Sequence, residues 1–266
     1  MMKKRNFKLY CSLALIVLIV LLALFAPLLP YDPNSIDISN KFAPPSLTHL
    51  LGTDHLGRDV FTRLIYGARL SLFAVVLIFA CILSFSFVVG FVAGYKGGLW
   101  DKILMRICDV FFAFPTFILA LFFIAIFGVG LVNVILAIAL THWAWYARMI
   151  RSLVLEQKNQ GFVLASKALG TSDIKVICRH ILPFVLSQIS VLITLDIGHM
   201  LLHIAGLSFL GLGVQAPNTE WGVMISDAAP FVMSEPQLML YAGLAIFISV
   251  AAFNLLGEAL QERGQR

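Results

Sequence analysis

The sequence predicts an all-α polytopic membrane protein with six transmembrane helices. The chain has 266 residues, of which 60% are hydrophobic and only 12% are charged. A soluble domain typically carries about 25% charged residues, so this chain holds more apolar surface than one soluble core buries. A helix that crosses the ~30 Å hydrocarbon layer of a membrane needs about 20 mostly apolar residues, and six stretches come close to that length.

The predicted spans cover residues 9–29, 70–93, 105–127, 131–147, 184–210 and 238–257. The first follows a basic N-terminus and could be mistaken for a signal peptide. Its apolar run is too long for that, and Pro27 follows Ala26 where a cleavage site would fall. We therefore expect an uncleaved first span.

The distribution of Lys and Arg predicts the orientation, because cytoplasmic loops are enriched in both residues. With the N-terminus inside, 15 of the 19 basic residues fall on the cytoplasmic side. The four outside are Lys41, Arg58, Arg63 and Arg69. Both ends are therefore expected in the cytoplasm, and the net charge of +5 needs no nucleic-acid partner.

These spans define one transmembrane domain with three long extramembrane segments. The expected organisation is an N-terminal tail and first helix (1–29), an outer loop (30–69), a transmembrane core (70–257) that contains an inner loop (148–183), and a cytoplasmic tail (258–266). A second outer loop covers 211–237, and the inner loop is expected as two short helices broken at Gly170.

Small and breaker residues inside the spans predict local packing. Gly90 and Gly94 form a Gly-x-x-x-Gly pair, which lets a neighbouring backbone approach closely. Pro115 removes one backbone hydrogen bond from the third span and is expected to kink it. The four cysteines show no metal-ligand spacing and are expected to pack as small apolar residues.

The inner loop carries the motif that first indicates a family. Residues 162–170 read Phe-Val-Leu-Ala-Ser-Lys-Ala-Leu-Gly, and residues 179–183 read Arg-His-Ile-Leu-Pro. This pattern resembles the coupling motif of ABC-importer permeases, although that motif's Glu falls at Leu164 and its second Ala at Ser166. The resemblance implies a short cytoplasmic helix that docks on an ATPase subunit. The implied coupling residues are Ala165, Ser166, Lys167, Gly170, Asp173, Leu182 and Pro183.

Three further stretches resemble the peptide/nickel (dipeptide/oligopeptide/nickel) subfamily of these permeases. They are residues 51–72, which begin Leu-Gly-Thr-Asp-His-Leu-Gly-Arg-Asp, residues 145–148, and residues 207–222. The resemblance covers almost the whole chain in order. It implies the type I ABC-importer permease fold in a bacterial inner membrane.

The same resemblance implies partners and no enzymatic activity in this chain. No Gly-x-x-x-x-Gly-Lys-Ser/Thr phosphate loop occurs in the sequence, so ATP and Mg²⁺ are expected to be used by a separate ATPase and no cofactor is expected here. The implied partners are a second homologous permease, two ATPase subunits, an extracytoplasmic substrate-binding protein and membrane lipid.

Ionisable residues on the fifth predicted span suggest what crosses the membrane. Asp196, His199 and His203 share one helical face, and His142 lies on the fourth span. Such residues are costly in a membrane and usually face a cavity or the bundle interior. A carboxylate and imidazoles also suit a divalent ion such as nickel, so His199 and His203 are candidate metal ligands. Asp196 holding a histidine in a purely structural pair is the alternative.

Residues 194–203 and 142–148 also resemble the C-type permease of nickel transporters in this subfamily. The expected function is therefore passage of nickel or a nickel chelate. A di- or oligopeptide permease of the same architecture is the alternative. A secondary transporter is disfavoured by the coupling motif, and a membrane-embedded enzyme by the lack of a catalytic cluster at one interface.

Overall fold

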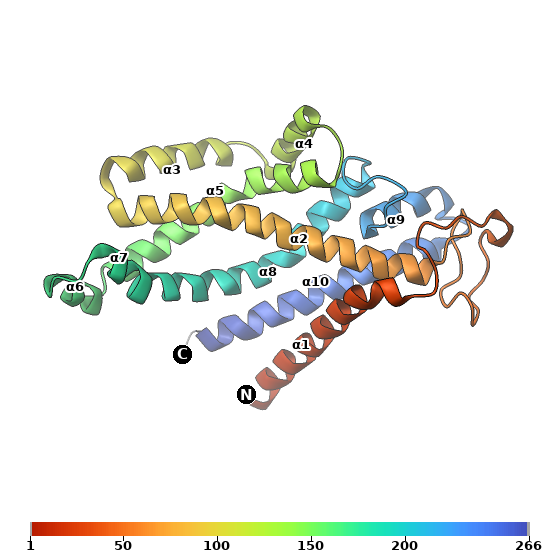
Figure 1. Cartoon of the computed structure of the whole chain (residues 1–266), viewed down its shortest axis with the longest axis horizontal. Coiled ribbons are helices and arrows are strands. Elements are labelled where there is room, and N and C mark those ends of the chain that lie inside the picture. Colours follow the sequence, from red (N-terminus) through yellow and green to blue (C-terminus); the bar gives the residue numbers. More distant parts are fainter. Residues whose placement is uncertain (1, 265–266) are drawn as a thin grey trace. The chain divides into compact units, whose positions relative to one another are not determined.

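The computed structural model describes the backbone of residues 2–264 and the side chains of residues 8–263 (Figure 1). The terminal basic residues Lys3, Lys4, Arg5 and Arg266, which the orientation argument counted, lie outside the described side chains.

The described chain is all-helical, as predicted, and contains no strand beyond one isolated bridge between Thr53 and Asp59. Its α-helices are α1 (Met2–Phe25), α2 (Val60–Phe91), α3 (Gly98–Phe112), α4 (Thr116–Phe127), α5 (Leu131–Lys158), α6 (Gly161–Ala168), α7 (Asp173–Val176), α8 (Leu182–Phe209), α9 (Trp221–Ala228) and α10 (Pro236–Gly264). Two π turns, Val92–Lys96 and Ile177–Ile181, follow α2 and precede α8.

Within the described residues, four helical segments are long and apolar enough to cross a membrane: Lys8–Leu28, Val60–Lys96, Asp173–Phe209 and Pro236–Arg263. A fifth span exists if the bent pair α3 and α4 counts as one. Length and composition alone thus identify four or five of the six predicted spans in the described residues. The predicted span 131–147 forms the first part of α5, although polar residues such as Asn133 and His142 interrupt its apolar run.

The third predicted span differs most from expectation. Residues 105–127 are not one kinked helix, because α3 ends at Phe112, α4 begins at Thr116, and the two axes meet at 89°. Pro115 lies at this break, where its ring fixes φ and its nitrogen has no hydrogen to donate. Both predicted outer loops also contain helix. α2 begins at Val60, inside the first predicted outer loop, and α9 lies within the second.

The chain forms two compact units. The first contains the described residues up to Leu77, Ile124–Ile135, and those from Thr194 onward; the second contains Ile78–Phe123 and Leu136–Ile193. In the first unit, α1 packs along α10 (Figure 1). Lys8 near the start of α1 lies 3.7 Å from Glu258 and 3.9 Å from Glu262 near the end of α10. The two helices are thus antiparallel, and the start of α1 lies at the same end of this unit as the end of α10.

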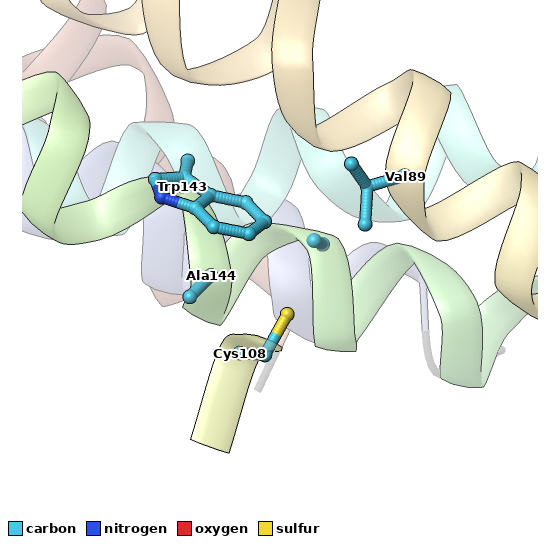
Figure 2. Close-up of a cluster of buried hydrophobic side chains, with 5 residues drawn as sticks. Val89, Cys108, Trp143 and Ala144 are labelled. Carbon is cyan, nitrogen blue, oxygen red and sulfur yellow. The ribbon is translucent and has the colours of Figure 1, made fainter. Parts of the chain in front are cut away.

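The core of the second unit joins α2, α3 and α5 (Figure 2). Val89, Cys108, Trp143 and Ala144 meet there, and Cys108 is fully buried. The Trp143 ring packs edge-on against Phe85 and Phe111, with centroids 4.8 and 5.1 Å away. Aromatic pairs in this geometry add stability beyond their buried area. Cys108 therefore packs as a small apolar residue, as expected for all four cysteines, whereas Cys11, Cys81 and Cys178 are exposed in this chain.

Gly90 and Gly94 let α2 and α5 approach closely, as their spacing predicts. A Cβ atom on Gly90 would lie 2.7 Å from the Ala147 oxygen and 2.7 Å from the Ile150 Cβ. A Cβ on Gly94 would lie 2.9 Å from the Arg151 oxygen. These distances are shorter than ordinary van der Waals contact, so the two helices could not keep this separation with larger residues.

Gly90→Ala is therefore expected to destabilise the purified transporter by about 1–3 kcal/mol, the usual cost of overpacking. Gly243→Ala on α10 is the matched control, because a Cβ there meets no atom within 4 Å. Thermal unfolding of both variants provides the comparison. Equal melting temperatures for the two variants would contradict the close α2–α5 packing.

Candidate functional site

The predicted coupling segment forms two short helices, as expected. α6 carries Ala165, Ser166 and Lys167, and α7 begins at Asp173. Between them Gly170 adopts φ +82°, in the left-handed region that glycine enters without steric cost. Its amide donates to the Lys167 oxygen at 2.9 Å, which ends α6.

A tyrosine that the sequence reasoning missed anchors this segment to the end of α2. The Tyr95 hydroxyl donates to the Asp173 carboxylate, and the Lys167 ammonium lies 3.4 Å from the same carboxylate. Lys167 also lies 4.5 Å from the Tyr95 ring centroid, in cation–π geometry. The hydrogen bond to Tyr95, with support from Asp173, raises the pKa of Lys167. The structure thus brings two predicted coupling residues together around a third side chain.

A second cation strengthens the same anchor. Lys158, the last residue of α5, donates to the Tyr95 carbonyl oxygen at 2.5 Å. The Gln157 side chain donates to the His180 carbonyl at 3.3 Å. These bonds tie α5, the π turn after α2 and the segment before α8 into one body. No local sequence spacing indicates them, since the partners lie far apart in the chain.

The coupling segment exposes an apolar surface. Leu169 is 87% exposed and Ile174 is 76% exposed, while Phe162 and Leu164 are about half exposed. Val163 faces inward and is fully buried. Exposed apolar residues that gather on one short segment are typical of an interaction site. We call Phe162, Leu164, Leu169 and Ile174 the coupling face.

The remaining predicted coupling residues, Leu182 and Pro183, lie at the first turn of α8. Leu182 is half-buried and Pro183 is exposed. The Leu182 amide donates to the Ile177 oxygen and closes the π turn, and Pro183 has no amide hydrogen to donate. Both residues therefore lie inside the continuous helical segment Asp173–Phe209, where the π turn passes into α8, and outside the coupling face.

Arg148 and Arg151 find partners that the sequence did not predict. Arg151 donates to Asp101 through Nη2 at 2.6 Å, and Arg148 pairs with Asp109. Both acids belong to α3. These two ion pairs join α5 to α3.

Two of the predicted cargo-path residues are in contact on α8. His199 Nδ1 lies 3.1 Å from Asp196 Oδ1, and His203 Nδ1 lies 2.7 Å from the His199 carbonyl oxygen. The His199 side chain is 70% exposed and that of Asp196 is 21% exposed. Met200, between the histidines, is fully buried and packs in the core of the first unit.

His142 belongs to the second unit and bonds within its own helix. Its Nδ1 lies 2.9 Å from both the Thr141 hydroxyl and the Ile138 carbonyl oxygen. Among the described residues, no group of three or more His, Cys, Asp or Glu side chains could hold a metal ion. The assignment of His199 and His203 as metal ligands therefore stays a prediction.

A buried charge network organises the outer loop of the first unit. Arg58 donates to Asp54 at 2.7 Å and to Asp227 at 3.0 Å, and Arg63 donates to Asp227 at 3.2 Å. Both arginine side chains are almost fully buried. Nearby, His55 stacks on Phe231 at 5.4 Å, and burial lowers the His55 pKa. Asp227 was missed because it lies far along the chain from its partners.

Glu220 fixes the start of α9 in the same unit. Its carboxylate accepts the amides of Gly222 and Val223 at 2.8 and 3.3 Å, and it accepts the Ser71 hydroxyl at 2.9 Å. Glu220 is 1% exposed, and burial raises its pKa. Glu is not among the usual N-cap residues, which are Ser, Thr, Asp and Asn, so Glu220 is not a standard start signal and α9 was missed.

With this geometry in place, comparison with known proteins assigns the family. Residues 86–264 match the model described as "Binding-protein-dependent transport system inner membrane component". The chain belongs to this family. Residues 4–45 match the N-terminal TM domain of oligopeptide transport permease C.

Three named relatives of this permease cover nearly its whole length. The nickel transport system permease protein NikC of Escherichia coli is 50% identical over 94% of this chain and 91% of its own. The metal-staphylopine import system permease protein CntC of Staphylococcus aureus is 48% identical over 94% of this chain and 87% of its own. The glutathione transport system permease protein GsiD of Escherichia coli is 40% identical over 93% of this chain and 82% of its own.

Membership confirms the predicted ABC-importer permease of the peptide/nickel subfamily and its type I fold. Such a binding-protein-dependent permease is embedded in the inner membrane, works with ATPase and substrate-binding partners, and is not itself an enzyme. The matched region contains α6, α7 and the acidic and histidine residues of α8.

Proposed function

We propose that this permease forms half of the pathway that carries nickel or a nickel chelate across the inner membrane. The observation that supports this most is the 50% identity to the nickel permease NikC across almost the full length of both chains. CntC, at 48% identity, is named for the import of a metal–staphylopine complex. A nickel chelate is therefore a candidate cargo as well as the free ion. GsiD, at 40%, makes a peptide-type cargo the second candidate.

The transport complex would contain this chain, a second homologous permease, two ATPase subunits and an extracytoplasmic binding protein. ATP and Mg²⁺ would be used by the ATPase subunits, and this chain would bind no cofactor. Charge asymmetry supports placing both termini and the coupling segment in the cytoplasm. The antiparallel contact of α1 with α10 also supports this, because ends on one side require an even number of crossings. With the bent α3–α4 pair counted as one span, α5 would be the sixth.

Coupling would occur where the ATPase presses on α6 and α7. Ala165, Ser166 and Gly170 would shape the docking helix, while Lys167 and Asp173 would hold it against Tyr95. Leu182 and Pro183 would pass the movement directly into α8, since they form its first turn. A rigid anchor matters here because a loose loop would absorb the push of the ATPase instead of transmitting it.

The cargo path would include His142, Asp196, His199 and His203. His199 Nδ1 would donate a hydrogen bond to the Asp196 carboxylate, and this bond would hold the imidazole ring in one orientation. Nε2 would then be the nitrogen that contacts the cargo. Imidazole nitrogen suits nickel, and the exposed His199 ring can reach a passing ligand.

The deciding experiment measures uptake of labelled nickel by cells that express the complete transporter. His199→Ala combined with His203→Ala is expected to lower nickel uptake at least about tenfold while assembly and ATPase activity persist. Leu202→Ala is the matched control, because Leu202 is a half-exposed neighbour on α8. Unchanged uptake in the double variant would make the histidines structural. Uptake of glutathione or a dipeptide by the native transporter, without nickel uptake, would favour the peptide function.

A further inference from the structure

A cavity of about 1050 Å³ opens on the first unit between α1 and the beginning of α2. This volume is at the upper end of the range for ligand sites in proteins, roughly 300–1,000 Å³. One wall is apolar and includes Val20, Leu24, Phe73 and Val76. The rim is polar and includes Tyr31, Asp32, Asn34, Tyr66, Arg69 and Thr219. The cavity therefore fits an amphipathic molecule.

The rim carries one positive and one negative charge that do not neutralise each other. Arg69 is exposed, and no carboxylate among the described side chains pairs with it. Asp32 is exposed as well, and its Oδ1 accepts only the backbone amide of Asn34, at 2.8 Å. The cavity thus offers a cationic donor for a phosphate and a carboxylate for an ammonium group.

Two buried oxygens at this rim have no hydrogen-bond partner in the described part of the chain. They are Asn34 Oδ1 and Thr219 Oγ1, and Thr219 is only 6% exposed. Buried polar atoms are nearly always paired, so two unpaired oxygens that line the same cavity favour a polar group of a ligand or a bound water there. The Asn34 oxygen needs a donor such as an ammonium hydrogen, and the Thr219 hydroxyl can donate to a phosphate or ester oxygen.

We propose that this cavity binds a zwitterionic phospholipid with a primary ammonium headgroup. The phosphate contacts Arg69, the ammonium group lies by Asp32 and Asn34, and an acyl chain lies along the apolar wall of α1 and α2. A soluble zwitterion would leave that wall in water. A purely anionic lipid would place no cation beside Asp32.

The test uses the complete purified transporter, stripped of lipid in detergent and titrated with phosphatidylethanolamine under native mass spectrometry. The native complex is expected to retain this lipid more tightly than phosphatidylglycerol. Arg69→Gln and Asp32→Asn should each weaken retention by about tenfold or more, as expected for loss of one charge-assisted hydrogen bond. Lys41→Gln, an exposed cation of the same outer loop outside the cavity, should leave retention unchanged.

Each other outcome would overturn the proposal. If the native complex retained phosphatidylglycerol as tightly as phosphatidylethanolamine, Asp32 would not bind the ammonium group. If the Arg69→Gln variant retained phosphatidylethanolamine as tightly as the native complex, Arg69 would not bind the phosphate. Glycerophosphoethanolamine that competes as well as the intact lipid would show that the apolar wall is unused. A native complex that retains no lipid would show that a partner subunit covers the cavity. Asp32 lies in an exposed loop, so Asp32→Asn is expected to fold. Its lipid retention therefore tests the proposal even if Arg69→Gln does not fold.

Discussion

Arg58→Met is expected to reduce the stability of the assembled transporter strongly. The Arg58 side chain is 3% exposed and bonds both Asp54 and Asp227. The substitution keeps much of the side-chain volume. It removes Arg58 Nε, which donates to the buried Asp54 Oδ2 at 2.7 Å. Arg63 is itself 2% exposed and donates to the Pro33 carbonyl oxygen at 3.1 Å. Among the described side chains it would then be the one cation left beside both Asp54 and Asp227.

Removal of one member of a buried ion pair typically costs about 3–5 kcal/mol, because the remaining charge loses its compensation. A domain is stable by only about 5–15 kcal/mol, so we expect a large drop in melting temperature and in membrane expression. Lys41→Met is the matched control, since Lys41 is an exposed cation of the same loop with no carboxylate partner.

Arg58→Lys separates charge from geometry in this network. Lysine keeps the charge but lacks the planar fork that lets Arg58 reach Asp54 through Nε and Asp227 through Nη2. An intermediate loss of stability is therefore expected. If Arg58→Met melted at the same temperature as Lys41→Met, the network would not stabilise the outer loop.

The parts of the fold that follow from local chemistry could be predicted. Apolar runs of about membrane length predicted α1, α8 and α10, because the thickness of the hydrocarbon layer sets the length of a spanning helix. The Gly90–Gly94 spacing gave a close helix contact, and the break at Gly170 gave two coupling helices. Helical spacing also placed Asp196 beside His199, since residues three apart share a face.

The features that could not be predicted depend on tertiary packing. Pro115 was expected to bend one helix, but the degree of the break depends on what surrounds it, and the structure shows 89°. Asp227 meets Arg58 although they are 169 residues apart, and Tyr95 meets Asp173 across 78 residues. No spacing rule connects such pairs. Whether His142, His199 and His203 meet one another likewise depends on how several helices pack. Spacing along one helix could therefore predict only the contact of Asp196 with His199.

Leu169→Asp combined with Ile174→Asp is expected to abolish coupled transport while the permease still folds. Both side chains are largely exposed on the coupling face, so their replacement removes no internal packing. A charged side chain would have to be desolvated when the ATPase docks there. Loss of one interface hot spot costs about 2 kcal/mol or more, which corresponds to a roughly 30-fold weaker docking equilibrium.

Leu47→Asp is the matched control for this double variant, because Leu47 is a fully exposed leucine in the outer loop. Two measurements are needed: co-purification of the ATPase with the permease, and binding-protein-stimulated ATP hydrolysis in vesicles. Both should fall in the coupling-face variant and neither should change in Leu47→Asp. Normal co-purification with lost stimulation would locate the defect in transmission instead of docking, and the Tyr95–Asp173–Lys167 anchor would then be the element to test. Normal values of both would exclude the coupling face from the ATPase contact.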